Sequence, residues 1–441
     1  MAEKPSSTSL FSFFRDFLKW SVTGSKRYHI WMGSLTFLML LGTYAYTYQL
    51  RFGLGVTGMT DYVNWGLYIS NFTFLVGIAA AAVMLVLPAY ILQDVDFSKV
   101  VLIGEGLAVT ALIMCLAFVT VDLGGPHRIW HMLPMIGYFN WPRSMLAWDV
   151  IVLNGYLLLN LLVPFYILYS HYCGREPDKK KYVPFVVLSV FWAVSIHMVT
   201  AFLYSALPSR PYWNNALLGP RFLASAFAGG PALMIVILTF IRDKTEYDIP
   251  QKTIQKLALI VTVAAQINLV MLASEFFKEF YAPTHHSLSA TYLFFGLKGY
   301  HGLVPYIWTS IVLNLIATGM LTMHRFRNNK TTLLLSCILL FVAIWLEKGM
   351  GLVVPGFIPS PLGEIVEYSP TWVELCVTLG IWAGGFFLFT LLIKAAIRIE
   401  TRYKALQQEK VDTEPSQTEN SLETAEPTQE YSSSLTETEV E

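Results

Sequence analysis

Long apolar segments recur along the chain between short polar ones, and this pattern predicts membrane-spanning helices. A hydrocarbon core about 30 Å thick requires roughly 20 residues of helix, and strands would leave backbone groups without partners in lipid. Ten segments have the necessary length and composition. They lie at roughly 30–50, 66–92, 99–121, 146–170, 182–206, 221–241, 253–277, 303–323, 331–350 and 373–397.

The composition supports this interpretation, because only 14% of the residues are charged and the mean hydropathy is +0.52. Soluble domains carry about a quarter charged residues. The sequence therefore predicts an all-α integral membrane protein with ten transmembrane helices, partnered by the lipid bilayer and not by nucleic acid. The four cysteines form no CxxC pair, which argues against an iron–sulfur or zinc cradle.

Three regions make up the predicted organisation of the chain. In residues 1–28, Phe and Leu alternate with Arg15 and Lys19, which predicts a cytoplasmic arm with an interfacial helix. Residues 29–400 form the ten-helix membrane domain. Residues 401–441 form an acidic cytoplasmic tail, which we expect to be disordered because it has almost no bulky apolar residues.

The distribution of Lys and Arg predicts the orientation of the chain. The N-terminal arm, the even-numbered loops and the C-terminal tail hold 22 of the 30 basic residues. Positive charge accumulates on the cytoplasmic side of membrane proteins. We therefore expect a multi-pass protein of the cytoplasmic membrane with both termini inside.

Ionisable residues of the predicted spans gather at the opposite, outer edge. A charge in the bilayer costs several kcal/mol unless it is paired or used, so such residues are functional candidates. His197 follows the start of the fifth span near Tyr182, and about 22 Å of helix rise place it in the outer half. The group consists of Asp122, His127, Arg128, His131, Arg143, Asp149, His197, Glu275, Lys278, Glu279, Glu347 and Lys348.

Polar residues in three spans recur with helical spacing, so each set lies on one helix face. Asp149, Tyr156 and Asn160 are spaced by 7 and 4 residues in the fourth span. His197 and Tyr204 share a face of the fifth span. Such stripes should face the bundle, where they either connect helices or form a site. The third stripe contains Asn268, Glu275 and Glu279. Lys278 and Lys348 could serve as neutralising partners for Glu275, Glu279 or Glu347.

A quinone suits these residue types, because its two carbonyl oxygens gain or lose protons together with electrons. A carboxylate or imidazole within hydrogen-bond distance can exchange such protons. Haem b is the alternative, and it needs two axial ligands. His197 is the only histidine well inside a span, and His301 is its only conceivable partner. No Gly-rich phosphate loop follows a strand, so nucleotide binding is not indicated.

Several short motifs occur in a distinctive order along the chain. Asp122–Arg128 closes the third span, and Ser144–Asp149 opens the fourth. The other motifs are Asn64–Leu67, Phe74–Gly77, Ser195–His197, Pro220–Ala226 and Gly229–Gly230. In this combination the sequence resembles the NrfD/polysulfide-reductase (PsrC) membrane-subunit family over about residues 30–400. The segment Lys348–Phe357 and the ten-span length resemble the branch with DsrP and the Hdr-like menaquinol oxidoreductase integral membrane subunits of sulfur-metabolising prokaryotes.

The resemblance implies a fold, a substrate and partners. The fold has two inverted four-helix bundles, formed by helices 2–5 and 6–9 and flanked by helices 1 and 10. Menaquinone or menaquinol would bind near the outer face of the first bundle, with no haem or Fe–S cluster in this chain. A ferredoxin-like Fe–S subunit would dock outside, and the DsrP branch adds multihaem cytochrome c, cytochrome b and heterodisulfide-reductase-like subunits.

The resemblance also implies site residues. The catalytic candidates are Asp122, His127, Asp149 and His197, of which His197 would support the quinone head group or relay protons while the others contact it. The candidate quinone-binding residues are Asp122, His127, Arg128, Asp149, Tyr156, His197 and Glu275; Tyr156 and Glu275 rest on their stripes and not on a family motif. Where the family has Gly-Arg-Pro, this chain has Gly124-Gly125-Pro126 with Arg128 two residues further on.

The sequence thus predicts the quinone-interacting membrane subunit of a respiratory complex in sulfur metabolism, without a redox cofactor of its own. The alternative is a secondary transporter or a proton-translocating subunit, since polytopic chains with repeats often transport. A polar cluster near one surface counts against transport. Glu105, about 9 Å into the third span, could begin a proton path or pair with Lys99.

Overall fold

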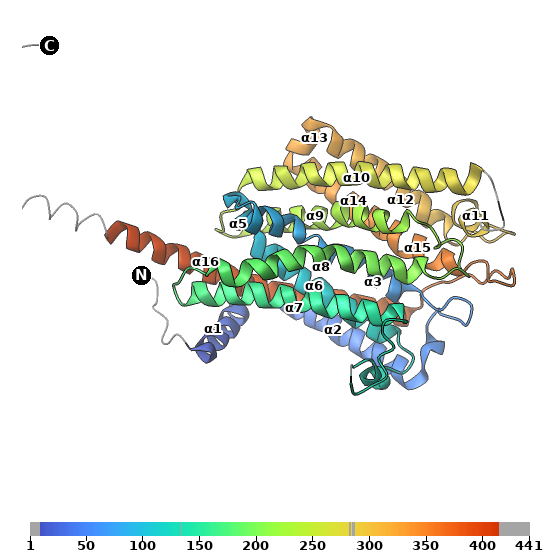
Figure 1. Cartoon of the computed structure of the whole chain (residues 1–441), viewed down its shortest axis with the longest axis horizontal. Coiled ribbons are helices and arrows are strands. Elements are labelled where there is room, and N and C mark those ends of the chain that lie inside the picture. Colours follow the sequence, from blue (N-terminus) through green and yellow to red (C-terminus); the bar gives the residue numbers. More distant parts are fainter. Residues whose placement is uncertain (1–8, 134, 282–283, 285–286, 414–441) are drawn as a thin grey trace, which may run out of the picture.

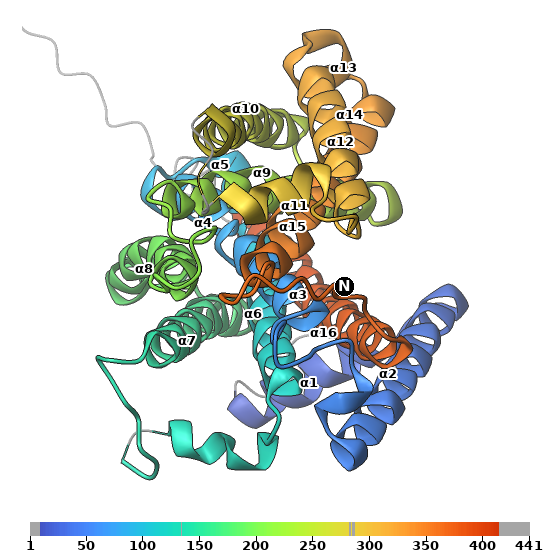
Figure 2. The same ribbon diagram turned by 90° about the vertical axis from the view of Figure 1, so that its right-hand side faces the viewer.

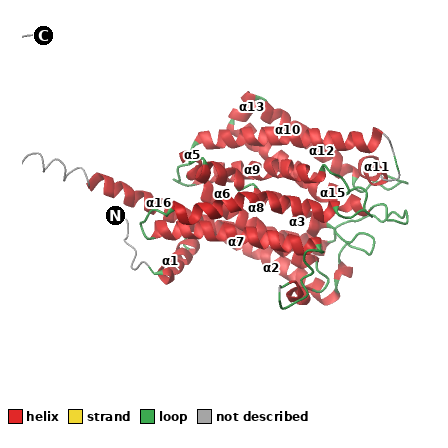
Figure 3. Ribbon diagram, in the orientation of Figure 1, coloured by secondary structure: helices red, strands yellow, loops and turns green. Residues whose placement is uncertain are grey.

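Helices make up nearly all regular structure in the computed structural model, which describes residues 9–133, 135–281, 284 and 287–413 (Figure 3). Within these ranges nine spans are long and apolar enough to cross a membrane. The prediction of an all-helical membrane fold is confirmed. Eight of the spans begin with α3 (Leu67–Ala80), α6 (Val101–Asp122), α7 (Met145–Tyr172), α8 (Lys179–Ser205), α9 (Leu218–Lys244), α10 (Gln251–Tyr281), α12 (Val304–Thr322) and α14 (Lys330–Trp345), and the ninth with α16 (Trp372–Thr413).

Two of these spans are interrupted by irregular turns. The span of α3 continues through α4 (Val83–Val86) and the π-helical turn η2 (Leu87–Ile91). The span of α14 continues through the π-helical turn η5 (Leu346–Met350), α15 (Gly351–Val353) and η6 (Val354–Phe357). Such turns shift the register of a helix and frequently occur at functional sites.

Helix α2 (Lys26–Phe52) contains the predicted first span, but it is not among the nine. Its 27 residues are enough to cross a bilayer, yet Thr43, Thr47 and Gln49 lower the hydropathy of its second half. It packs along α16, where a Cβ atom added to Gly42 would lie 2.6 Å from the Gly380 Cα. The count of ten spans therefore stays a prediction.

The spans between α2 and α16 pack as two groups of four helices (Figure 2). In the first bundle, α3 contacts α6 and α8, and α7 completes the ring by contacting α6 and α8. In the second bundle, α9 contacts α10 and α14, and α12 contacts the same two helices. Both groups match the predicted division into helices 2–5 and 6–9.

The spans run between two ends of the molecule, which we call the α5 end, after α5 (Val95–Ser98), and the α11 end, after α11 (Leu288–Phe295) (Figure 1). Both α3 and α9, the first helices of the two bundles, run from the α11 end to the α5 end. A chain that crosses the membrane four times returns to the side from which it started. The first helix of the second bundle therefore points in the same direction as the first helix of the first bundle, and so on for the following helices. The predicted inverted orientation is not seen in this comparison.

Small residues bring the two bundles close together. Helix α3 packs against α9 and η5. A Cβ atom added to Gly230 of α9 would lie 2.0 Å from the Ala81 Cβ, just beyond α3. Glycine at such a position lets two helix backbones approach, as at many helix contacts in membranes.

The two terminal segments lie at the α5 end. Helix α1 (Leu10–Val22) buries Phe13 against Tyr172 of α7, while Phe11 and Phe14 are exposed. Its place in a membrane interface stays a prediction, as does the cytoplasmic location of this end. Helix α16 continues to Thr413, so residues 401–413 are helical where we expected disorder. The remainder of the predicted tail lies outside the described residues.

Candidate functional site

Asp149 is buried one turn inside α7, towards the α11 end of the first bundle. The Ser144 hydroxyl accepts a hydrogen bond from the Ala147 N–H at 3.4 Å, and this cap fixes the start of α7. Only 1% of Asp149 is exposed. Its Oδ1 lies 2.9 Å from the hydroxyl of Thr200 on α8. The first turn of α7 thus presents a carboxyl group to the bundle interior and away from solvent.

The Thr200 hydroxyl has two acceptors for one hydrogen. Its Oγ1 is 2.9 Å from Asp149 Oδ1 and 2.8 Å from the Ile196 carbonyl oxygen. A hydroxyl donates one hydrogen bond but can also accept. Thr200 can therefore donate to an ionised Asp149, or accept from a protonated Asp149 while donating to Ile196. Both protonation states of Asp149 have a hydrogen-bonded arrangement without movement of the backbone.

His197 lies one turn before Thr200 on α8 and is completely buried. Its Nδ1 is 3.1 Å from the Ala193 carbonyl oxygen. A carbonyl oxygen only accepts, so in this arrangement Nδ1 carries the hydrogen and Nε2 of the neutral ring is an acceptor. Nε2 has no hydrogen-bond partner among the described residues. His197 thus offers a buried, open acceptor one helical turn before Thr200, whose hydroxyl lies 2.9 Å from Asp149 Oδ1.

Tyr204 extends this group towards α3. Its hydroxyl hydrogen-bonds to the hydroxyl of Thr73 on α3. The rings of Trp65 and Trp213 pack edge-on against it, with centroids 5.7 and 5.2 Å away. The carboxyl groups of Asp149 and Asp122 are both close enough for direct charge interactions with its hydroxyl. We call Asp122, Asp149, His197, Thr200 and Tyr204 the first-bundle cluster.

Asp122, the last residue of α6, has a buried Oδ1 without a hydrogen-bond partner in the described part of the chain. A chain of hydrogen bonds holds this helix end in place. The Tyr68 hydroxyl donates to the Gln49 side chain at 2.7 Å, and Gln49 donates to the Val121 carbonyl oxygen at 2.7 Å. Buried Glu374 lies near enough to interact with the Asp122 charge. Helices α2, α3 and α16 thereby position Asp122.

A separate group of buried charges occupies the second bundle. Arg221 of α9 forms an ion pair with Glu275 of α10, and its Nη2 lies 2.8 Å from Glu347 Oε1 in η5. The amides of Asn268 and Asn314 each donate to Glu347 at 3.3 Å. Four helical segments meet at these side chains, which we call the second-bundle cluster. Its cation is Arg221, whereas the sequence suggested Lys278 or Lys348.

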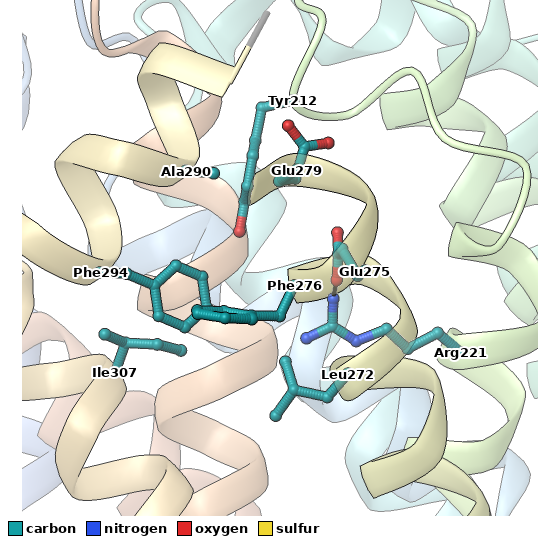
Figure 4. A pocket seen from close by; sticks show the side chains of 9 residues that line it. All are labelled: Tyr212, Arg221, Leu272, Glu275, Phe276, Glu279, Ala290, Phe294 and Ile307. Carbon is teal, nitrogen blue, oxygen red and sulfur yellow. Dashed lines mark ion pairs between the residues drawn. The ribbon is translucent and has the colours of Figure 1, made fainter. Parts of the chain in front are cut away.

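A small cavity adjoins the second-bundle cluster towards the α11 end (Figure 4). The space open to the centre of a water molecule is about 10 Å³, enough for roughly one water. The polar groups of its wall come from Tyr212, Arg221, Glu275 and Glu279, and the Arg221 guanidinium points at Glu275 (Figure 4). The opposite wall is apolar and includes Phe276 and Phe294.

The sequence model of the family described as "Polysulphide reductase, NrfD" matches residues 55–358, more than two thirds of the chain. The chain belongs to the NrfD family. The matched range contains both clusters, and it excludes α1, α2 and α16. The predicted family is therefore confirmed.

Relatives of this NrfD chain are similar along most of their length. A protein of Archaeoglobus fulgidus named "Hdr-like menaquinol oxidoreductase integral membrane subunit" is 23% identical over 82% of this chain and 91% of its own. The "Menaquinone reductase, integral membrane subunit" of Nitratidesulfovibrio vulgaris is 24% identical over 79% and 86%. A selenate reductase subunit of Mesobacillus selenatarsenatis is 22% identical over 82% and 92%.

Four of the predicted quinone-binding residues of this NrfD chain lie apart from the first-bundle cluster. His127 and Arg128 are exposed in η3 (Pro126–Met132), in a loop that projects away from the helices (Figure 2). Glu275 belongs to the second-bundle cluster. Asp122 and Asp149 both lie near the Tyr204 hydroxyl, and His197 is buried on α8, the helix that carries Tyr204. Tyr156 lies two turns further along α7 than Asp149, near Glu105. These placements leave the assigned roles as predictions.

The predicted stripe of Asp149, Tyr156 and Asn160 does face the bundle, since all three are at most 5% exposed. Sequence reasoning missed Thr200 and Arg221. Thr200 stands three residues after His197, where helical spacing could have revealed it. Arg221 lies in the Pro220–Ala226 motif, but no role of its own was predicted for it. An arginine inside an apolar span was itself a signal of a buried partner.

In the part of the chain that the structure describes, no three His, Cys, Asp or Glu residues group closely enough to hold a metal ion. This finding does not bear on haem, which two histidines can hold. His301, the sequence's candidate partner for His197, is exposed before α12, whereas His197 is buried in α8.

Proposed function

We propose that this chain is the quinone-interacting membrane subunit of a redox complex, and that it oxidises menaquinol or reduces menaquinone in the first bundle. Membership of the NrfD family supports this, as do relatives named as a menaquinol oxidoreductase subunit and a menaquinone reductase subunit. The proposed site is the first-bundle cluster, towards the α11 end.

The main support for this site is that buried side chains able to exchange protons have atoms without a hydrogen-bond partner within the ranges that the structure describes. His197 Nε2 and Asp122 Oδ1 are buried without partners among the described residues. Leaving a buried polar atom unsatisfied costs about 1–3 kcal/mol, so a fold that retains two of them in the same half of one bundle points to a polar ligand. A quinol head group, with a hydroxyl at each end, supplies two donors for such acceptors.

Asp149 and His197 each accept one of the two protons that the quinol releases. Asp149 takes a proton from a quinol hydroxyl, and Thr200 turns its hydroxyl from Asp149 to Ile196 to accommodate it. His197 Nε2 is an acceptor for the second proton, since its Nδ1 hydrogen is held by Ala193. Trp65 and Trp213 cover the Tyr204 side of the cluster and exclude water. Reduction uses the same groups in the opposite sense.

Oxidation of the quinol also releases two electrons, which need an acceptor. We propose that a docked Fe–S protein of ferredoxin type, or a cytochrome, takes them at the α11 end, where the loops leave the membrane. Multihaem cytochrome c, cytochrome b and heterodisulfide-reductase-like subunits would complete the complex, in a pathway of anaerobic sulfur respiration. The name of the Archaeoglobus fulgidus relative, an Hdr-like menaquinol oxidoreductase subunit, supports a heterodisulfide-reductase-like partner.

The test is menaquinol-driven reduction of the redox centres in the complex that co-purifies with this chain. We expect the centres to be reduced by a soluble menaquinol analogue and this reduction to require the chain. Equal reduction rates in a complex assembled without it would rule the function out.

A further inference from the structure

We propose that the second bundle carries protons between the α5 end and the α11 end along a polar route centred on Glu347, and that Lys348 links this route to the quinol site. The inference rests on the proposed function, because quinol turnover supplies the driving force. Menaquinol oxidation releases two protons and two electrons, and the electrons pass to the redox partner. The route would allow protons to be exchanged with the α5 side of the membrane as well as with the α11 side.

The route opens at the α11 end through the cavity of Figure 4. Glu279 and Glu275 of α10 lie on its wall, four residues apart on one helix face. Glu279 stands two residues before the end of α10. The cavity has room for about one water, which can bridge groups that do not touch.

The centre of the route is the carboxylate of Glu347, only 2% exposed. Arg221 joins it to Glu275, and Asn268 and Asn314 donate to its two oxygens. A single ion pair would suffice to pin two helices. Here the oxygen of the fully buried Asn268 amide is also left without a partner within the described ranges, directly beside Glu347. This unpartnered acceptor oxygen beside a buried carboxylate can bind a water molecule or a proton in transit.

The route continues to the α5 end along one face of α12. The Thr318 hydroxyl donates to Asn314 Oδ1 at 3.1 Å, and Thr322 follows one turn later as the last residue of the helix. Gln266 of α10 donates to the Thr322 hydroxyl at 2.9 Å. Asn314, Thr318 and Thr322 span about 12 Å of helix. Hydroxyl groups can accept one proton and give another, so the line reaches from Glu347 to the end of the span.

Lys348 connects the route with the first bundle. Its Nζ donates to the Phe222 carbonyl oxygen at 3.2 Å and lies 4.1 Å above the Phe222 ring. It forms no ion pair with any carboxylate that the structure describes, although it is 5% exposed. Its Nζ would lie 3.4 Å from a Cβ atom added to Gly77 of α3, so its charge stands at the junction with the first bundle, where it can act on His197. A proton arriving at His197 would therefore repel Lys348 and disturb the adjacent Glu347.

The experiment uses the complete complex, reconstituted in one orientation into liposomes with pH indicators in both compartments. A quinol site at the α11 end without a route exchanges all its protons with the α11 side. The proposal predicts that turnover also changes the pH on the α5 side. Thr318→Val and Asn314→Leu should abolish this α5-side change while electron transfer continues, because neither replacement leaves a buried charge unpaired. Thr47→Val, at an exposed position of α2 bonded only within its own helix, is the control.

The outcomes separate this inference from the proposed function. No electron transfer from quinol in the unmodified complex contradicts the proposed function itself. Normal electron transfer without an α5-side pH change overturns the route alone. An α5-side change that survives both Thr318→Val and Asn314→Leu also overturns it. Lys348→Gln removes an unpaired charge, so the fold should tolerate it. If Lys348 links the route to the quinol site, electron transfer should continue in this variant while the pH change on the α5 side is lost. An undiminished pH change on the α5 side contradicts this link.

Discussion

Glu347 and Lys348 are neighbours in sequence but face different bundles. Glu347 binds Arg221 in the second bundle, and Lys348 reaches the Phe222 carbonyl oxygen towards the junction with the first. Both lie in the π-helical turn η5, whose wider winding redirects successive side chains. The turn thereby lets adjacent charges of opposite sign serve two separate environments without forming an ion pair with each other.

Asp149→Asn tests the proton acceptor of the first-bundle cluster. An amide has nearly the same shape as a carboxyl group but cannot take up a proton. General acid–base groups contribute roughly 100-fold or more to rates, so menaquinol-driven reduction should fall by about this factor. The intact complex should still purify. Asp248→Asn, at an exposed carboxylate paired with Lys99, is the chemically matched control and should leave turnover unchanged. Wild-type turnover in Asp149→Asn would remove this residue from the mechanism.

Thr200 is a positioning residue, and replacements at this site separate its hydroxyl from its shape. Thr200→Val removes the hydrogen bond to Asp149. A hydrogen bond to a charged group is worth about 1.5–3 kcal/mol, so kcat should fall roughly tenfold or more with little change in KM. Thr200→Ser keeps the hydroxyl and should restore most of kcat. If Thr200 had only a structural role, Thr200→Val and Thr200→Ser would differ in thermal stability but not in kcat.

The sequence predicted the helices of the membrane domain well, because lipid permits few alternatives to a long apolar helix. It also predicted which face of α7 is buried, from the spacing of Asp149, Tyr156 and Asn160. Helical periodicity fixes the face of a side chain, and it requires no knowledge of neighbouring helices.

Contacts between distant segments were beyond this reasoning. Glu275 and Arg221 are 54 positions apart and lie on different helices, so spacing could not pair them. His127 was assigned to the site through its family motif, Asp122–Arg128, but the loop that follows α6 turns outward and exposes it. The direction of a loop depends on tertiary packing. Local sequence patterns contain little information about it.

Arg221 should be essential to the stability of the second bundle. Its side chain is 10% exposed and serves two carboxylates, Glu275 and Glu347. Removing one partner of a buried pair typically costs about 3–5 kcal/mol, because the other charge is left uncompensated. Arg221→Met should therefore lower the thermal unfolding temperature in detergent strongly. Lys278→Met breaks the pair with Glu279, where the lysine is 50% exposed, and should cost less than about 1 kcal/mol. Equal losses in the two variants would contradict a buried structural charge at Arg221.

Gly230→Ala tests the close packing between the two bundles. The added methyl group would lie 2.0 Å from the Ala81 Cβ and 3.3 Å from the Gly77 carbonyl oxygen. The helices must separate, and overpacking of this kind costs about 1–3 kcal/mol. Gly33→Ala on α2 places its methyl group in open space, and it should be neutral or stabilise by about 0.5–1 kcal/mol through helix propensity. The comparison is made by thermal unfolding of the purified chain in detergent. If both substitutions stabilise equally, α3 and α9 do not meet as closely as described. If Gly230→Ala alone destabilises, small residues at this junction set the distance between the bundles, and with it the position of Lys348 beside Gly77 of α3.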